Sequence, residues 1–207
     1  MIIALLLAAA APAPQSAIDA RPARSAIDEE RAFAADAQKN GQWTAFRKYA
    51  ADDAAMFVPE RVNAQAWLKD RTDPPVSVFW WPGRSYVSCD GTVAVNTGPW
   101  VRGYGKAVGY FTTIWTRQAD GSWKWIYDAG EPEKFARGEG GDISPFIASC
   151  KGKPSGVMQA KSQHSKDQSL AWLINLGPRG QRRLRVYQWN GARYQMVIED
   201  KVAAGAK

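Results

Sequence analysis

The stretch that decides the fold is residues 110–130, YFTTIWTRQADGSWKWIYDAG. Two runs rich in β-branched and aromatic residues flank Asp120-Gly121, a dipeptide typical of tight hairpin turns. Ala119 and Ser122 would close a two-residue turn between the runs. The stretch therefore predicts two antiparallel strands joined directly at this turn.

The register that follows from this turn places Thr113 opposite Asp128 and Trp115 opposite Ile126. Side chains alternate along a strand, so each run divides between two faces. One predicted face carries Phe111, Thr113, Trp115, Ile126 and Asp128. The other carries Ile114, Thr116, Trp123, Trp125 and Tyr127. Both faces are apolar, so we expect helices to cover one and a partner surface or the C-terminal segment to cover the other. A single acid among aromatic residues suggests a pocket, but it does not name a reaction.

Short helices are expected before the strands. Helical spacing and caps predict helices at residues 25–41, 42–50 and 63–70, with Ser25 and Asp28 as a capping pair. Strands are expected at residues 54–58, 76–88 and 92–101, before the hairpin. This order indicates an α+β fold, in which a curved antiparallel sheet wraps around N-terminal helices as a cone with an internal pocket. Residues 25–132 would form this domain.

The remaining chain divides into a polar linker at residues 133–168 and a basic C-terminal β meander at residues 169–207. Three strands are predicted in the meander, at residues 169–176, 182–189 and 192–199. Three strands alone bury too little surface to be stable, so we expect the meander to pack on the main domain. It would cover Trp123, Trp125 and Tyr127 or extend the main sheet.

The amino terminus, MIIALLLAAAAPAPQS, resembles a secretory signal peptide over residues 1–16, followed by a linker at residues 17–24. Its apolar run of about ten residues is too short to span a bilayer core of about 30 Å. It departs from the usual signal peptide in having no Lys or Arg after Met1. From the apolar run and the small residues that follow it, we expect export and cleavage, a periplasmic location and no stable membrane insertion.

The chain has two cysteines, Cys89 and Cys150. An oxidising compartment permits a disulfide between them, which would close a loop of about 60 residues. Two separate buried thiols are nearly as good an interpretation of the sequence. No Cys-x-x-Cys motif is present.

The net charge of +7 comes from the C-terminal part of the chain, because residues 151–207 carry 11 Lys or Arg against 3 Asp or Glu. A solubilising surface explains this charge adequately. Weak binding of residues 151–207 to an anionic surface is the alternative. Arginines 182, 183, 185 and 193 alternate with aromatic residues, but an exported protein is not expected to bind nucleic acid.

Four segments carry a resemblance to a known family. They are ERAFAADAQKNG at residues 30–41, FRKYAADDAAMFVP at 46–59, FWWPGRSYVSCDGTVAVNTGPW at 79–100 and GYFTTIWTRQADGSWKWIYDAG at 109–130. Together they resemble the nuclear transport factor 2-like superfamily and, within it, the SnoaL-like branch of bacterial domains of unknown function. The resemblance implies a curved sheet on helices, a conical pocket and a homodimer. It covers about half the chain.

Asp128 resembles a late-strand pocket position of that superfamily. The candidate ligand-binding residues are Glu30, Phe46, Tyr49, Trp81, Phe111, Trp115 and Asp128. Steroid isomerase relatives combine a carboxylate base with a Tyr and a neutral Asp, and no complete set of this kind is matched here. The single histidine, His164, lies in a polar stretch, away from the position that dehydratase-like members use.

Three functions follow from these residues. The first is a module that binds a small apolar or aromatic molecule. The second is an isomerase or dehydratase with Asp128 as general acid or base, and the third is a structural module. Glu30 or Tyr49 would assist Asp128 in the enzyme. The sequence favours binding over catalysis. It contains no metal-ligand cluster or nucleotide-binding glycine motif, so we expect neither a metal nor a cofactor.

The three functions predict different interiors. An enzyme needs at least two polar groups that converge inside a solvent-open cavity. A binding module needs an apolar cavity with one polar anchor, whereas a structural module has no cavity larger than a few waters.

Overall fold

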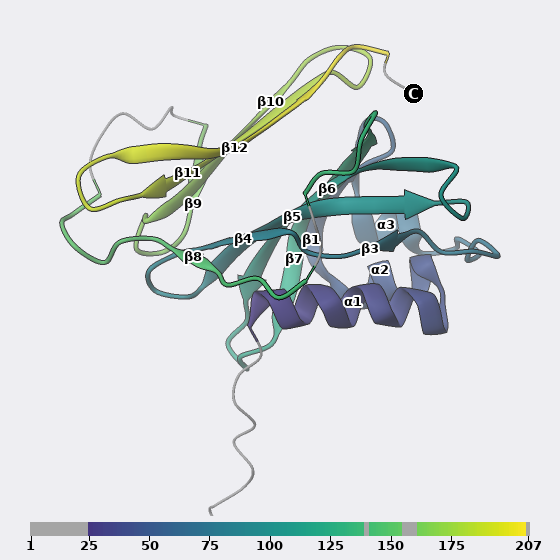
Figure 1. Cartoon of the computed structure of the whole chain (residues 1–207), viewed down its shortest axis with the longest axis horizontal. Helices are drawn as coiled ribbons and strands as arrows, with labels where there is room; N and C mark the ends of the chain where they lie inside the picture. The colour runs from purple at the N-terminus through teal and green to yellow at the C-terminus, as the bar shows by residue number, and fades with distance from the viewer. Residues whose placement is uncertain (1–24, 139–140, 155–160, 206–207) are drawn as a thin grey trace, which may run out of the picture.

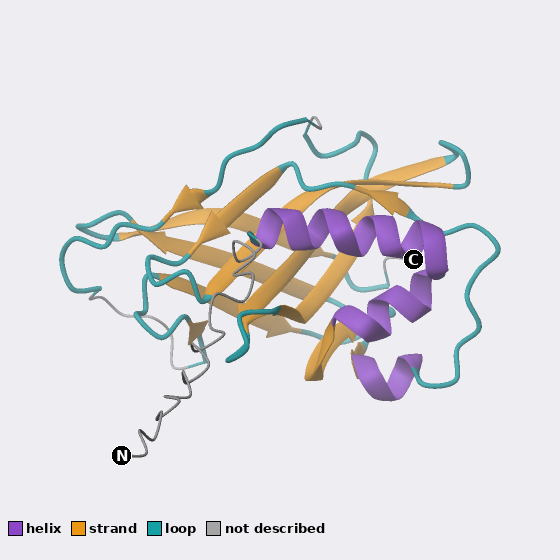
Figure 2. Cartoon of the chain, turned by 90° about the horizontal axis from the view of Figure 1, so that it is seen from below, coloured by secondary structure: helices purple, strands orange, loops and turns teal. Residues whose placement is uncertain are grey.

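The computed structural model describes residues 25–138, 141–154 and 161–205. The predicted signal peptide and the linker at residues 17–24 lie outside the described residues. The helices are α1 (Ala26–Asn40), α2 (Gln42–Tyr49) and α3 (Ala64–Leu68), and they lie on one face of a large sheet (Figure 2). The side chain of Ser25 accepts a hydrogen bond from the backbone N–H of Asp28 and caps α1, as the sequence predicted. The α+β class is confirmed.

The main sheet has eight strands, in the order β2-β1-β7-β6-β5-β4-β8 with β3 paired to β5. Their bounds are β1 Ala50–Phe57, β2 Arg61–Asn63, β3 Phe79–Trp80, β4 Arg84–Val87, β5 Val93–Arg102, β6 Ala107–Arg117, β7 Trp123–Pro132 and β8 Phe146–Ile147. The prediction of a wholly antiparallel sheet is wrong, because β1 pairs with β7 and β4 pairs with β8 in parallel. Long connections separate the strands of both pairs, so no hairpin forces them to run in opposite directions.

The second sheet has four strands instead of the predicted three. They are β9 (Gln163–His164), β10 (Leu170–Leu176), β11 (Arg182–Trp189) and β12 (Tyr194–Val202), in the order β12-β11-β10-β9. The additional strand, β9, has two residues and lies in a polar stretch, which gives no hydrophobic alternation to reveal it. Figure 1 shows this sheet and the helices on opposite sides of the main sheet.

Each face of the main sheet therefore contributes to a separate hydrophobic core. On the helix side, the sheet contributes Phe111, Trp115, Trp123 and Trp125. On the other side, Val95, Ile114 and Tyr127 pack against Leu170, Trp172, Leu184 and Val186 of the second sheet. The C-terminal segment thus covers the second face. However, the predicted placement of Trp123 and Trp125 on that face is wrong.

A β-bulge explains the different placement. Ile114 pairs with Tyr127 and Trp115 pairs with Trp125, so Ile126 is an extra residue in β7 and not the partner of Trp115. The bulge puts Trp115 and Trp125 on one face. Thr113 does pair with Asp128, as predicted.

The turn of this hairpin also differs from the prediction. The N–H of Gly121 donates to the carbonyl of Gln118, and the N–H of Gln118 donates to the carbonyl of Ser122. These bonds enclose a three-residue loop, in which Gly121 has a φ of 84°. The side chain of Asp120 accepts a hydrogen bond from the N–H of Ser122, 2.9 Å away, and stabilises this longer loop.

A disulfide joins Cys89 to Cys150, whose Cα atoms are 5.3 Å apart. Just before Cys150, the N–H of Ser149 donates to the carbonyl of Trp189 in β11. The N–H of Cys89 donates to the hydroxyl of Ser169, which comes directly before β10. The disulfide therefore lies where the two sheets meet. Among the described residues, no helix is long and apolar enough to cross a membrane.

Candidate functional site

A cavity of about 260 Å³ lies on the helix side of the main sheet, between α2, β1 and the strands β3, β5, β6 and β7. Six aromatic residues line it: Trp43, Phe46, Phe57, Trp80, Trp100 and Phe111. The charged residues of the wall are Asp128 and Arg102. Arg102 is exposed, whereas Asp128 is half-buried. An apolar cavity with a few polar groups is the usual form of a small-molecule site.

Asp128 is placed by β7, directly opposite Thr113 of β6. The Thr113 hydroxyl donates a hydrogen bond to Oδ2 of Asp128 over 2.8 Å. Burial raises the pKa of Asp128 to about 6, although the Thr113 hydroxyl and the charge of Arg182 partly oppose this rise. Within the described part of the chain, Thr113 is the one hydrogen-bond donor to this carboxylate. Oδ1 therefore remains for a ligand.

Glu30 lies on the inner side of α1 and is fully buried. Its carboxylate accepts three hydrogen bonds: from Nε1 of Trp80 at 2.9 Å, from Nε1 of Trp115 at 2.7 Å and from Nδ2 of Asn96 at 3.2 Å. Burial raises the pKa of Glu30 to about 7, the three donors lower it, and the nearby charge of Asp128 raises it further. Trp80 connects the two features, because it lines the cavity and also holds Glu30.

The structure brings only some of the predicted ligand-binding residues to this cavity. Phe46, Phe111 and Asp128 line it. Glu30 and Trp115 lie behind its wall, where Nε1 of Trp115 donates a hydrogen bond to Oε2 of Glu30.

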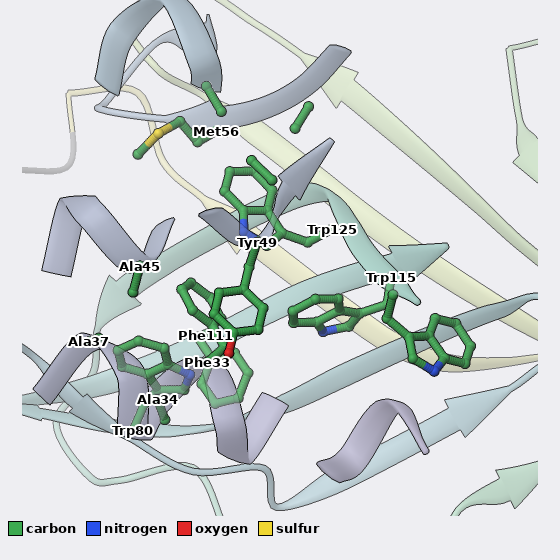
Figure 3. Packing of buried hydrophobic residues seen from close by; sticks show 14 of the residues in the cluster. Phe33, Ala34, Ala37, Ala45, Tyr49, Met56, Trp80, Phe111, Trp115 and Trp125 are labelled. Carbon is green, nitrogen blue, oxygen red and sulfur yellow. The ribbon is translucent and has the colours of Figure 1, made fainter. Parts of the chain in front are cut away.

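The remaining two candidates lie away from the lining. Tyr49 packs against Phe33, with ring centroids 5.0 Å apart, and Figure 3 shows these two rings close to Phe111 in the core. Trp81 pairs instead with the ring of Phe79, with centroids 5.5 Å apart.

The sequence interpretation missed four of the aromatic lining residues, Trp43, Phe57, Trp80 and Trp100. Two of them could have been found together. Trp80 and Trp100 are direct partners across β3 and β5, and partners in a sheet share a face. Trp43 and Phe57 could not be found in this way, because they come from a helix and from the end of β1.

Another hollow of about 300 Å³ lies between β4, β12 and the segment that follows β7. Arg137 lines it and pairs with Asp200 at 2.7 Å and with Glu133 at 3.1 Å. Two carboxylates already pair with the Arg137 guanidinium, so we place the candidate site in the aromatic cavity. The described residues contain no group of three or more His, Cys, Asp or Glu that could hold a metal ion. His164 is exposed on β9, in the second sheet.

No protein-family model and no curated protein sequence matches the chain. Ten chains of solved structures match it, and they include the following three. A ketosteroid isomerase-like protein from Parabacteroides distasonis has 16% identity over 53% of this chain and 89% of its own, with a TM-score of 0.42. A DUF3225-family protein of unknown function from Pectobacterium atrosepticum has 11% identity over 52% and 89%, with a TM-score of 0.38. An aromatic ring hydroxylase-like protein from Novosphingobium aromaticivorans has 11% identity over 54% and 89%, also with a TM-score of 0.38.

Likeness at this level carries no inference about a ligand or a reaction. The curved sheet with N-terminal helices on one face fits the nuclear transport factor 2-like fold. The SnoaL-like branch stays a prediction.

Proposed function

We propose that this protein binds a small apolar or aromatic molecule in the aromatic cavity, with Asp128 as the polar anchor. One observation carries the proposal: a half-buried carboxylate, with a single donor among the described residues, faces a cavity of about 260 Å³ whose wall contains six aromatic residues. A carboxylate in such surroundings is stabilised by a further donor, and a ligand can supply one.

The interior fits binding better than the other two functions. A filled structural module would not contain a cavity with room for several waters. An enzyme would need a second polar group converging with Asp128, yet Glu30 is enclosed behind Trp80 by its three donors. Of the other polar lining residues, Gln42 accepts a hydrogen bond from the N–H of Val78, and Arg102 is exposed. The pKa of Asp128, about 6, still suits a general acid or base near neutral pH. An isomerase or dehydratase that uses Asp128 is therefore the second candidate.

Native mass spectrometry of protein purified from its own host tests the proposal. We expect a bound small molecule that is lost in Asp128→Asn. Asp53→Asn is the matched control, because it makes the same chemical change at an exposed position of β1. A ligand-free mass in all three proteins, together with no binding of any aromatic probe, would refute the proposed function.

Export to the periplasm is a separate proposal, which rests on the amino-terminal sequence. The disulfide between Cys89 and Cys150 is consistent with an oxidising compartment. Cell fractionation and mass measurement of the mature amino terminus test it. An intact Met1 in the cytoplasm would refute export.

Two interactions of the whole chain are also proposals. A homodimer would have to use a surface other than the sheet face that the second sheet covers, and sedimentation measures its presence. Weak binding of residues 151–207 to an anionic surface would depend strongly on salt. Co-sedimentation with anionic vesicles at low and high salt tests this binding.

A further inference from the structure

We propose that the ligand of the aromatic cavity is an organic cation: a protonated or quaternary amine attached to a compact apolar or aromatic body, with its charge against Asp128. This inference rests on the proposed function and narrows its ligand class. Three features of the cavity point to a cation, namely the carboxylate of Asp128, the aromatic rings and the position of Arg102.

The first feature is the carboxylate of Asp128, which lies inside the cavity. Asp128 lines the wall and accepts a hydrogen bond from the Thr113 hydroxyl, 2.8 Å away. The charge of Arg182 in the second sheet lowers the pKa of Asp128, but Arg182 is buried and already forms an ion pair with Glu131. Among the described residues, no lysine or arginine forms an ion pair with Asp128. A ligand cation would supply the missing charge.

The second feature is the arrangement of the aromatic rings. The face of an aromatic ring attracts a cation within about 6 Å, and cages of such rings bind alkylammonium groups. The ring of Phe46 is steeply inclined to two other wall rings, at 77° to Trp43 and 66° to Trp80. Rings at such angles do not stack face to face, so their faces point in different directions. The ring of Trp100 already has a cation near its face, because the Arg102 guanidinium lies 5.7 Å from its centroid.

The third feature is the difference in solvent exposure between the two charged lining residues, Arg102 and Asp128. Arg102 is exposed at the solvent edge of the cavity, where water screens its charge. Asp128 is half-buried, so its charge is screened less. A cationic group is therefore favoured inside the cavity beside Asp128. An anionic group would be repelled from the same place.

Calorimetric titration with probes matched in shape and size tests the inference. Phenyltrimethylammonium and tert-butylbenzene have the same shape and differ in charge, and benzoate is the anionic probe. We expect phenyltrimethylammonium to bind at least about tenfold more tightly than tert-butylbenzene, which is the factor that one good charge contact supplies. We expect benzoate not to bind.

Two variants locate the charge contact. Asp128→Asn is expected to lower the affinity for phenyltrimethylammonium towards that of tert-butylbenzene, while the aromatic rings retain part of the preference for the cation. The variant is expected to leave the affinity for the neutral probe unchanged, which also shows that the cavity is intact. Asp53→Asn, at its exposed position, is expected to change neither affinity. If tert-butylbenzene binds as tightly as the cation, the inference is wrong and the proposed function stands. If no probe of any charge binds, both are wrong.

Discussion

Replacement of Glu30 by glutamine should remove a large part of the pH dependence of stability. Burial raises the pKa of Glu30 from its ordinary value of 4.5 to about 7. The folded protein therefore holds this proton more tightly than the unfolded chain does. The resulting stabilisation is fully present below pH 4.5 and is lost as the pH rises through 7. The difference between the two pKa values corresponds to about 3 kcal/mol.

Glutamine has nearly the same shape as glutamate, but its single carbonyl oxygen replaces only one of the two acceptor oxygens of Glu30. Trp80 donates to Oε1 and Trp115 to Oε2, so one indole N–H of the variant faces the new NH2 group and loses its acceptor. This loss costs about 1 to 3 kcal/mol at every pH and therefore does not alter the pH dependence that is measured. We expect the difference in free energy of unfolding between the wild type and Glu30→Gln to change by roughly 2 to 3 kcal/mol between pH 5 and pH 8, to the disadvantage of the wild type.

Urea unfolding followed by tryptophan fluorescence at pH 5, 6, 7 and 8 measures this change, with the disulfide kept oxidised. Glu60→Gln is the matched control, because Glu60 is exposed and its replacement should leave the pH profile of the wild type unchanged. Parallel profiles for the wild type and Glu30→Gln would show that Glu30 has an ordinary pKa in the folded protein. The reasoning from its burial would then be refuted.

Three further predictions concern stability. Replacing Cys89 and Cys150 by serine will lower the free energy of unfolding in urea by about 4 kcal/mol, because the disulfide spans 61 residues. Arg182→Met will cost about 3 to 5 kcal/mol in the same assay because it leaves Glu131 without its ion pair, and adding Glu131→Gln will recover part of the loss. Gly109→Ala will lower the melting temperature, with a cost of about 1 to 3 kcal/mol, because the added Cβ would lie 2.2 Å from the carbonyl oxygen of Glu131.

The sequence was most informative where a local pattern has one physical solution. Ser25 followed by Asp28 predicted the start of α1, because a serine side chain satisfies a free N–H of the first turn. The cavity was harder to predict, because its wall is assembled from six separate elements. Glu30 illustrates the limit: its position near the apolar stripe of α1 was visible, but the three donors that enclose it come from β3, β5 and β6.

The hairpin shows how two local errors can cancel. The real turn has one residue more than predicted, which shifts the register so that Arg117 pairs with Trp123 and Trp115 with Trp125. The extra loop residue, Ala119, lies on the β6 side of the turn, whereas the bulge adds Ile126 to the opposite strand, β7. The bulge therefore restores the predicted register at Thr113 and Asp128.

Between the turn and the bulge, every side chain of β7 therefore lies on the face opposite to the predicted one. Trp123 and Trp125 join the core under the helices for this reason. Alternation could not reveal the change, because both faces of the hairpin are apolar and each register buries equally hydrophobic residues. Asp128 was placed correctly because it lies beyond the bulge, where the two shifts have compensated.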